Sequence, residues 1–138
     1  MNLFNPFVDF QILKKSCLAI FCYDELMEDT PKIAKRRARE KRVISQMIAI
    51  YCSAHHDKRD HRSYSGDMIC ADCAMLDEYA VMRTERCKKM DQKTSCEECE
   101  NHCYKPEERQ RIREVMRYAG PRMITKHPLE AIRHLLGK

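Results

Sequence analysis

The chain has 138 residues, of which 34% are charged and 7% aromatic, with nine Cys, five Pro, three Gly and no Trp. This length suits one domain with a modest core, and the few Gly and Pro argue against a turn-rich β sandwich or barrel. The formal net charge of +5 is weak evidence for nucleic-acid binding, because seven thiolates bound to two Zn²⁺ would lower it to about +2. We therefore predict an all-α domain of about four helices with Cys-rich loops, stapled by metal.

The cysteine content and the N-terminus predict the compartment. An odd number of cysteines fits poorly with a fully disulfide-bonded secreted protein. The first ten residues lack the basic region of a secretory signal, and the apolar run Cys17–Tyr23 is too short to cross a bilayer. We expect a cytoplasmic protein without a membrane partner, in which clustered thiols are metal ligands or redox groups.

Residues 1–26 differ from the rest of the chain. They hold most of the Phe residues and two isolated cysteines, Cys17 and Cys22. One interpretation is that the natural start is Met27 and that residues 1–26 are a mis-assigned extension of the reading frame. The other is an amphipathic helix near residues 7–23 that packs on the domain. In both cases residues 27–138 form a single helical Cys/His-rich domain.

The first helix of that domain is predicted from about Pro31 to Cys52. Thr30 suits the N-cap, and Pro31 suits the first helical position. Its first half carries seven Lys or Arg between residues 32 and 42, including Arg36, Arg37 and Arg39. This run is either a solvated helix face or a cationic helix that contacts the phosphates of nucleic acid.

The remaining elements follow from apolar spacing and helix breakers. We expect a loop over 53–67, a helix from about Met68 to Met90, and a Cys-rich loop over 91–104. A third helix should open at Pro106 and stop at Gly120-Pro121, because Gly can adopt a left-handed cap and Pro cannot continue the helix. A last helix should run from Pro128 to Gly137.

The Cys and His spacing predicts two metal sites. The pairs Cys70/Cys73 and Cys96/Cys99 have the Cys-x-x-Cys spacing that places two sulfurs on one ion. Cys73 and Cys87 are expected on one helix, roughly 21 Å apart at 1.5 Å per residue, so they cannot share an ion. The remaining ligands then sort into one group on each side of that helix.

The two groups suit different metals. The first contains Cys52, His55 or His56, Cys70 and Cys73, and suits a tetrahedral structural Zn²⁺, with His56 slightly preferred. The second contains Cys87, Cys96, Cys99 and Cys103, and suits either Zn²⁺ or a [4Fe–4S] cluster. The alternative for each group is thiols that pack as small apolar side chains.

Several segments resemble the nitrous oxide-stimulated promoter family of small bacterial proteins. They are Tyr51-Cys52 with His55-His56, Ile69–Cys73, Tyr79-Ala80, His102–Pro106, Val115–Met123 and His127-Pro128. The resemblance covers about residues 32–136. It implies a role in nitrosative stress without a known reaction, and its cysteine pattern falls on the second group. Lys88 and Glu100 stand where relatives often have Pro after a cysteine, which weakens the iron–sulfur alternative.

Three functions are compatible with these patterns. The first is a metal- or cluster-containing protein of the nitric-oxide response. The second is a nucleic-acid-binding regulator that uses residues 32–42, and an anion contact is also conceivable at Arg117 and Arg122 beside Gly120-Pro121. The third, an iron–sulfur redox protein or enzyme, ranks lowest because no nucleophile–base arrangement or nucleotide-binding loop is visible.

Overall fold

The computed structural model describes residues 28–92, 95–96, 98–100 and 103–136. Both interpretations of residues 1–26 lie outside this part of the chain. The elements within it are α2 (Pro31–His55), β1 (His61–Arg62), β2 (Met68–Ile69), α3 (Ala71–Glu85), α4 (Pro106–Lys126) and α5 (Pro128–Leu135). The predicted all-α class with about four helices is confirmed. Over these described residues, none of the helices combines the length and the apolar character needed to span a bilayer.

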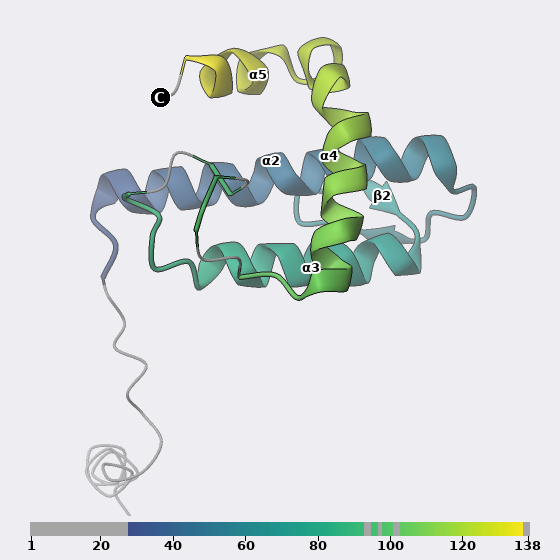
Figure 1. Cartoon of the computed structure of the whole chain (residues 1–138). Helices are drawn as coiled ribbons and strands as arrows, with labels where there is room; N and C mark the ends of the chain where they lie inside the picture. The colour runs from purple at the N-terminus through teal and green to yellow at the C-terminus, as the bar shows by residue number, and fades with distance from the viewer. Residues whose placement is uncertain (1–27, 93–94, 97, 101–102, 137–138) are drawn as a thin grey trace, which may run out of the picture.

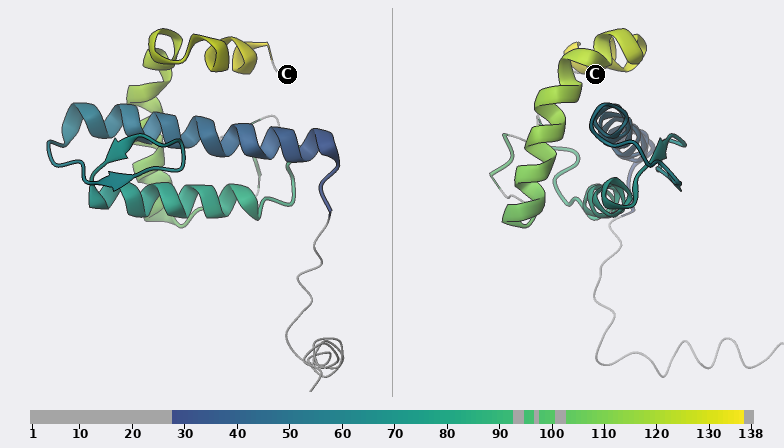
Figure 2. Two further views of the ribbon diagram at one scale, coloured as in Figure 1. Left: turned by 180° about the vertical axis from the view of Figure 1, so that it is seen from behind. Right: turned by 90° about the vertical axis from the view of Figure 1, so that its right-hand side faces the viewer.

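The molecule has three layers (Figures 1 and 2). Helices α2 and α3 lie side by side and run in opposite directions, and they form the middle layer. Helix α4 crosses one face of this pair, while the short hairpin β1–β2 covers the other face. The core lies where α2, α3 and α4 meet, and it includes Ile48, Leu76, Ala80 and Val115, each no more than 2% exposed.

Helix α2 begins where the sequence predicts. The hydroxyl of Thr30 accepts a hydrogen bond from the backbone N–H of Ile33, and Pro31 occupies the first turn. The helix ends at His55, three residues beyond the expected Cys52. Cys52 is therefore inside the last turn, where it is fully buried.

The segment expected to be a loop over 53–67 contains part of a hairpin. Strands β1 and β2 pair antiparallel, with His61 opposite Ile69, and Gly66 has the positive φ of 94° that the turn requires. Two buried polar side chains dock this hairpin on the helices: Ser45 accepts from the N–H of Ser65, and Asp77 accepts from the N–H of Tyr64. Apolar periodicity alone does not predict this turn, because side chains of the helices hold it in place.

Two helix boundaries differ from the prediction. Helix α3 spans Ala71–Glu85 and not 68–90, so the expectation that Cys73 and Cys87 share a helix is wrong. The twelve steps of helix from Cys73 to Glu85 still span roughly 18 Å, which keeps the two cysteines apart. At its N-terminus the sulfur of Cys70 provides the N-cap, accepting from the N–H of Cys73.

The predicted stop at Gly120-Pro121 is also wrong. Helix α4 continues through Pro121 to Lys126, because buried Ala119 and Met123 pack on either side of the proline and hold the helix on the core. The helix ends at Lys126, and the backbone of the C-cap His127 leaves the helical region before Pro128, as residues before proline usually do. Helix α5 then runs to Leu135, short of the expected Gly137.

Candidate metal centre

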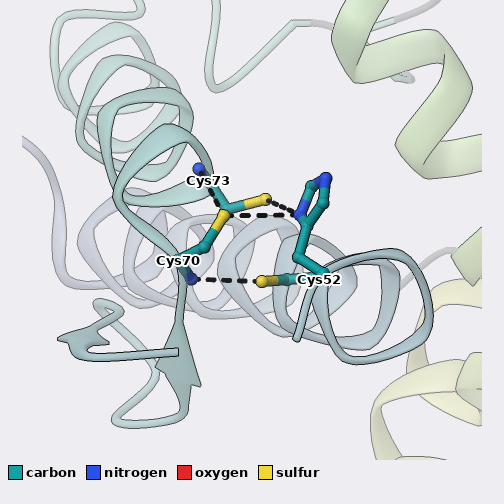
Figure 3. Close-up of side chains that lie close together, drawn as sticks. Cys52, Cys70 and Cys73 are labelled. Carbon is teal, nitrogen blue, oxygen red and sulfur yellow. Dashed lines mark hydrogen bonds between the residues drawn. The ribbon is translucent and has the colours of Figure 1, made fainter. Parts of the chain in front are cut away.

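Four potential ligands meet at one end of the α2–α3 pair. Cys52 comes from the last turn of α2, and His56 directly follows that helix. Cys70 is the N-cap of α3, and Cys73 lies in its first turn (Figure 3). Their ligand atoms all lie within 4.8 Å of one another, and no other group of three or more Cys, His or acidic side chains in the described residues does so.

The distances within this group match those around a tetrahedral ion. Nδ1 of His56 lies 3.3 Å from the sulfur of Cys70 and 3.4 Å from the sulfur of Cys73. With metal–nitrogen bonds of about 2.0 Å and metal–sulfur bonds of about 2.3 Å, two ligand atoms of a tetrahedron are about 3.5 Å apart. His56 therefore lies from Cys70 and Cys73 at the spacing of two ligands on one tetrahedral ion.

Backbone N–H groups support the sulfurs as thiolates would require. The N–H of Cys70 points at the sulfur of Cys52 at 3.2 Å, and the N–H of Cys73 points at that of Cys70 at 3.4 Å (Figure 3). These donors, together with the positive end of the α3 dipole, stabilise negative charge on sulfur. The centre is thus built from the N-terminus of one helix and the C-terminus of another.

The pKa values of the three thiols diverge when no metal is bound. Burial raises the pKa of Cys73, which is 2% exposed, and burial likewise raises that of Cys52. Burial opposes ionisation of Cys70 too, but hydrogen bonds from the N–H of Cys73 and from both neighbouring thiols outweigh it and lower its pKa. Cys70 is therefore the thiol of this group that ionises most readily.

The structure separates the two adjacent histidines. His55 lies outside the ligand group: its Nδ1 is 2.9 Å from the carbonyl of Tyr51, and its ring stacks on Tyr51 with centroids 4.2 Å apart. The ring also meets Tyr118 of α4 edge to face. His55 therefore helps α4 pack on α2, whereas His56 faces the sulfurs.

The second cysteine group is more open. Cys87, Cys96, Cys99 and Cys103 all line one cavity of about 870 Å³ between the end of α3 and the side of α4. Their sulfurs are not drawn together into a group like the first one. Cys96 and Cys103 are exposed, whereas Cys87 and Cys99 are partly buried.

The cationic residues singled out in the sequence have different surroundings. Arg36 forms an ion pair with Glu40. The side chain of Arg37 is 11% exposed; it forms an ion pair with Asp29 and donates a hydrogen bond to the carbonyl of Thr84 at the end of α3. Arg39 lines an apolar cavity of about 450 Å³ between α2, α4 and α5. Arg122 covers the ring of Tyr118 at 3.7 Å. Arg117 alone of these five residues lines the cysteine cavity.

Sequence reasoning missed the role of Arg37 at the end of α3. Its guanidinium bonds carbonyls 47 to 50 residues away, and no local pattern around residue 37 indicates such a contact. It also missed most of the cationic lining of the cysteine cavity. A signal for that lining was present, since Arg109, Arg113 and Arg117 recur every four residues along one helix face.

The fold and its ligand cluster define a small helical protein with a four-ligand Cys/His centre between two helix ends. Comparison with known proteins places it more closely: the chain belongs to the nitrous oxide-stimulated promoter family, whose sequence model matches residues 35–138. It is 34% identical over 105 residues to the uncharacterized protein YgbA of Escherichia coli strain K12, covering 74% of this chain and 80% of that protein. No solved structure shows significant similarity to this chain.

Proposed function

We propose that this protein binds a structural Zn²⁺ through Cys52, His56, Cys70 and Cys73 and acts in the response to nitrosative stress. The observation that carries the metal proposal is the convergence of three thiols and one imidazole within 4.8 Å. Protein groups fill all four positions of a tetrahedron, which is typical of structural rather than catalytic zinc. The link to nitrosative stress rests on the description of the family.

The chain's own residues would use the ion to fix helix ends. Two ligands belong to the C-terminal end of α2, and two belong to the N-terminal turn of α3. One ion would therefore cross-link chain segments that are 14 to 21 residues apart, as structural zinc sites do in small domains. Bound Zn²⁺ supplies only this cross-link, and the ligands would be deprotonated when they hold it.

We further propose that Cys87, Cys96, Cys99 and Cys103 hold a second metal, either Zn²⁺ or a [4Fe–4S] cluster. This proposal is supported by their lining of a single cavity. Because Cys96 and Cys103 are exposed, this group is more accessible to reagents in solution than the first group, in which Cys52 and Cys73 are buried and Cys70 is partly buried. We therefore assign any reactivity toward nitric oxide to the second group.

Nucleic-acid binding through α2 has less support. Four of its cations have carboxylate partners: Arg36 with Glu40, Arg37 with Asp29, Lys41 with Glu85 and Arg42 with Glu130. These pairs reduce the positive charge that the helix offers to phosphates. The metal proposal is accordingly the main one.

The adjacent histidines provide a matched test of the first site. We expect His56→Ala to weaken zinc affinity by more than about tenfold in a chelator competition, because it removes a ligand. His55→Ala should leave that affinity unchanged, because its ring contacts only Tyr51 and Tyr118 among the described aromatic residues. Equal affinities for the two variants would refute the site.

The second site is tested by metal analysis of Cys99→Ser beside the wild type. We expect the variant to lose one metal centre and to keep the zinc of the first site. Purification without oxygen decides the metal, since a cluster gives broad visible absorption and zinc gives none. Unchanged metal content in Cys99→Ser would contradict the second site while leaving the first intact.

A further inference from the structure

The wall of the cysteine cavity is strongly cationic. Three of its positive side chains follow the end of α3, and three come from α4: Arg86, Lys88, Lys89, Arg109, Arg113 and Arg117. No acidic side chain of the described residues lines the cavity with them. Four thiolates around one divalent ion would contribute a net charge of roughly −2, which leaves a surplus of positive charge.

Three arginines form a stripe along α4, and the repulsion between their charges destabilises the helix. Arg109, Arg113 and Arg117 are spaced four residues apart, and the stripe spans roughly 12 Å. Like charges at this spacing destabilise a helix by about 0.2–0.5 kcal/mol per pair. In the part of the chain that the structure describes, no carboxylate lies within ion-pair distance of Arg113 or Arg117, both of which are exposed.

Helix α2 shows the opposite arrangement. Four of its cations lie beside the carboxylates of Asp29, Glu40, Glu85 and Glu130. These four charges are neutralised by pairing, whereas Arg113 and Arg117 have no such carboxylate among the described residues. The guanidinium fork of Arg matches phosphate oxygens with two parallel hydrogen bonds, so the α4 stripe suits phosphate groups.

The size and floor of the cavity indicate a small organic molecule. Its volume of about 870 Å³ lies within the range of roughly 300–1,000 Å³ typical of ligand sites. Ile112, Met116 and Tyr104 line it beside the cations. An apolar surface of this kind can cover the body of a ligand while the arginines bind its charged groups.

We propose that this cavity binds a small molecule that carries two or more phosphate groups, next to the second cysteine group. The proposal needs the cationic wall and does not depend on which metal, if any, the cysteines hold. In this proposal the anion contacts Arg113 and Arg117 on α4, and not the basic run of α2.

The test uses the full-length protein with two probes, inorganic pyrophosphate and ADP, in calorimetric titrations at low salt. We expect both to bind, and Arg113→Ala/Arg117→Ala to lower the affinity at least about tenfold, since it removes two phosphate contacts. Lys32→Ala/Lys35→Ala removes the same charge from exposed positions of α2 outside the cavity, and it should bind as the wild type does. Arg86→Ala/Lys88→Ala tests the opposite wall and should repeat the loss.

The results distinguish an organic phosphate from free diphosphate, and both of these from a nucleic acid. Tighter binding of ADP than of pyrophosphate identifies an organic phosphate, and equal binding identifies free diphosphate as sufficient. The proposal is overturned if neither probe binds, or if the α4 and α2 double variants bind equally. It is also overturned if a single-stranded oligonucleotide binds through Arg113 and Arg117 while both probes fail. Metal content is measured on the same samples, so failure of the metal sites is recognised separately.

Discussion

Arg37 of α2 makes several polar contacts with residues far away in the sequence. One of its terminal nitrogens donates to the carbonyls of Thr84 and Glu85 at 2.8 Å and of Cys87 at 3.0 Å. Its Nε and its other terminal nitrogen donate to the two carboxylate oxygens of Asp29. The side chain thus gives the carbonyls at the end of α3 a side-chain donor, and it holds the chain just before the second cysteine group.

We expect Arg37→Lys to lower the free energy of unfolding by about 1–3 kcal/mol, measured by urea denaturation. A lysine keeps the charge but has a single nitrogen, so it cannot bond the carbonyls and Asp29 together. Arg36→Lys is the control, because Arg36 forms a surface pair with Glu40 that is worth roughly 0.3–0.5 kcal/mol. Equal losses in both variants would show that Arg37 has no special role.

The partner carboxylate gives a pH prediction. The hydrogen bond from Arg37 lowers the pKa of Asp29 below its usual 3.8. A lowered folded-state pKa stabilises the protein fully above the unfolded value, and this contribution is lost as the pH falls through the folded value. The stability difference between wild type and Asp29→Asn should therefore be constant from about pH 7 to pH 5 and shrink below about pH 4. A difference that already declines between pH 7 and pH 5 would contradict this assignment.

At the scale of elements, local signals located the helices better than their ends. Thr30-Pro31 marks the start of α2 correctly because the cap is made by adjacent residues. Gly120-Pro121 misleads because the core contacts of Ala119 and Met123 hold α4 together across the proline. The start of α3 is likewise set by a distant cause, since the hairpin that precedes it is docked by Ser45 and Asp77.

The candidate site was predictable to the same degree. The Cys-x-x-Cys spacing indicates Cys70 and Cys73 as ligands, and the length of α3 keeps Cys87 away from them although it lies beyond the helix and not on it as predicted. The sequence does not distinguish His55 from His56, because that choice depends on how α4 packs: Tyr118 from that helix meets the ring of His55. The sequence shows the arginine spacing on α4, but only the fold places that helix beside Arg86, Lys88 and Lys89 around the second group.

Substitution by alanine is expected to have opposite effects on stability at Gly120 and at Gly66. Gly120 lies inside α4, and an added Cβ would stand 3.8 Å from the flexible Cε of Met47, an ordinary contact. Gly120→Ala should therefore raise the free energy of unfolding by about 0.5–1 kcal/mol. Gly66 has a φ of 94°, so Gly66→Ala should lower it by about 1–2 kcal/mol. Thermal denaturation of the two variants tests this, and a destabilised Gly120→Ala would show that α4 needs flexibility beside Pro121.

At the scale of the whole molecule, different interactions hold the two ends of the α2–α3 pair together. The candidate zinc ligands gather at the end where α2 finishes, while Arg37 spans the end where α2 begins. Apolar side chains between them, including Ile48, Leu76 and Ala80, supply the continuous core. Each end should therefore open independently when its own interactions are removed.

Hydrogen exchange after removal of the proposed zinc tests this independence. In chelator-treated protein, we expect amides of Cys52–His56 and Ile69–Cys73 to exchange roughly tenfold faster or more, because the cross-link between these two segments is lost. The amides of Tyr64 and Ser65 should respond less, since Asp77 and Ser45 bind them directly. Amides around Thr84–Cys87 should change little, whereas Arg37→Lys should accelerate them and spare the zinc end. A uniform acceleration along α2 and α3 in either sample would show instead that the pair opens as one cooperative unit.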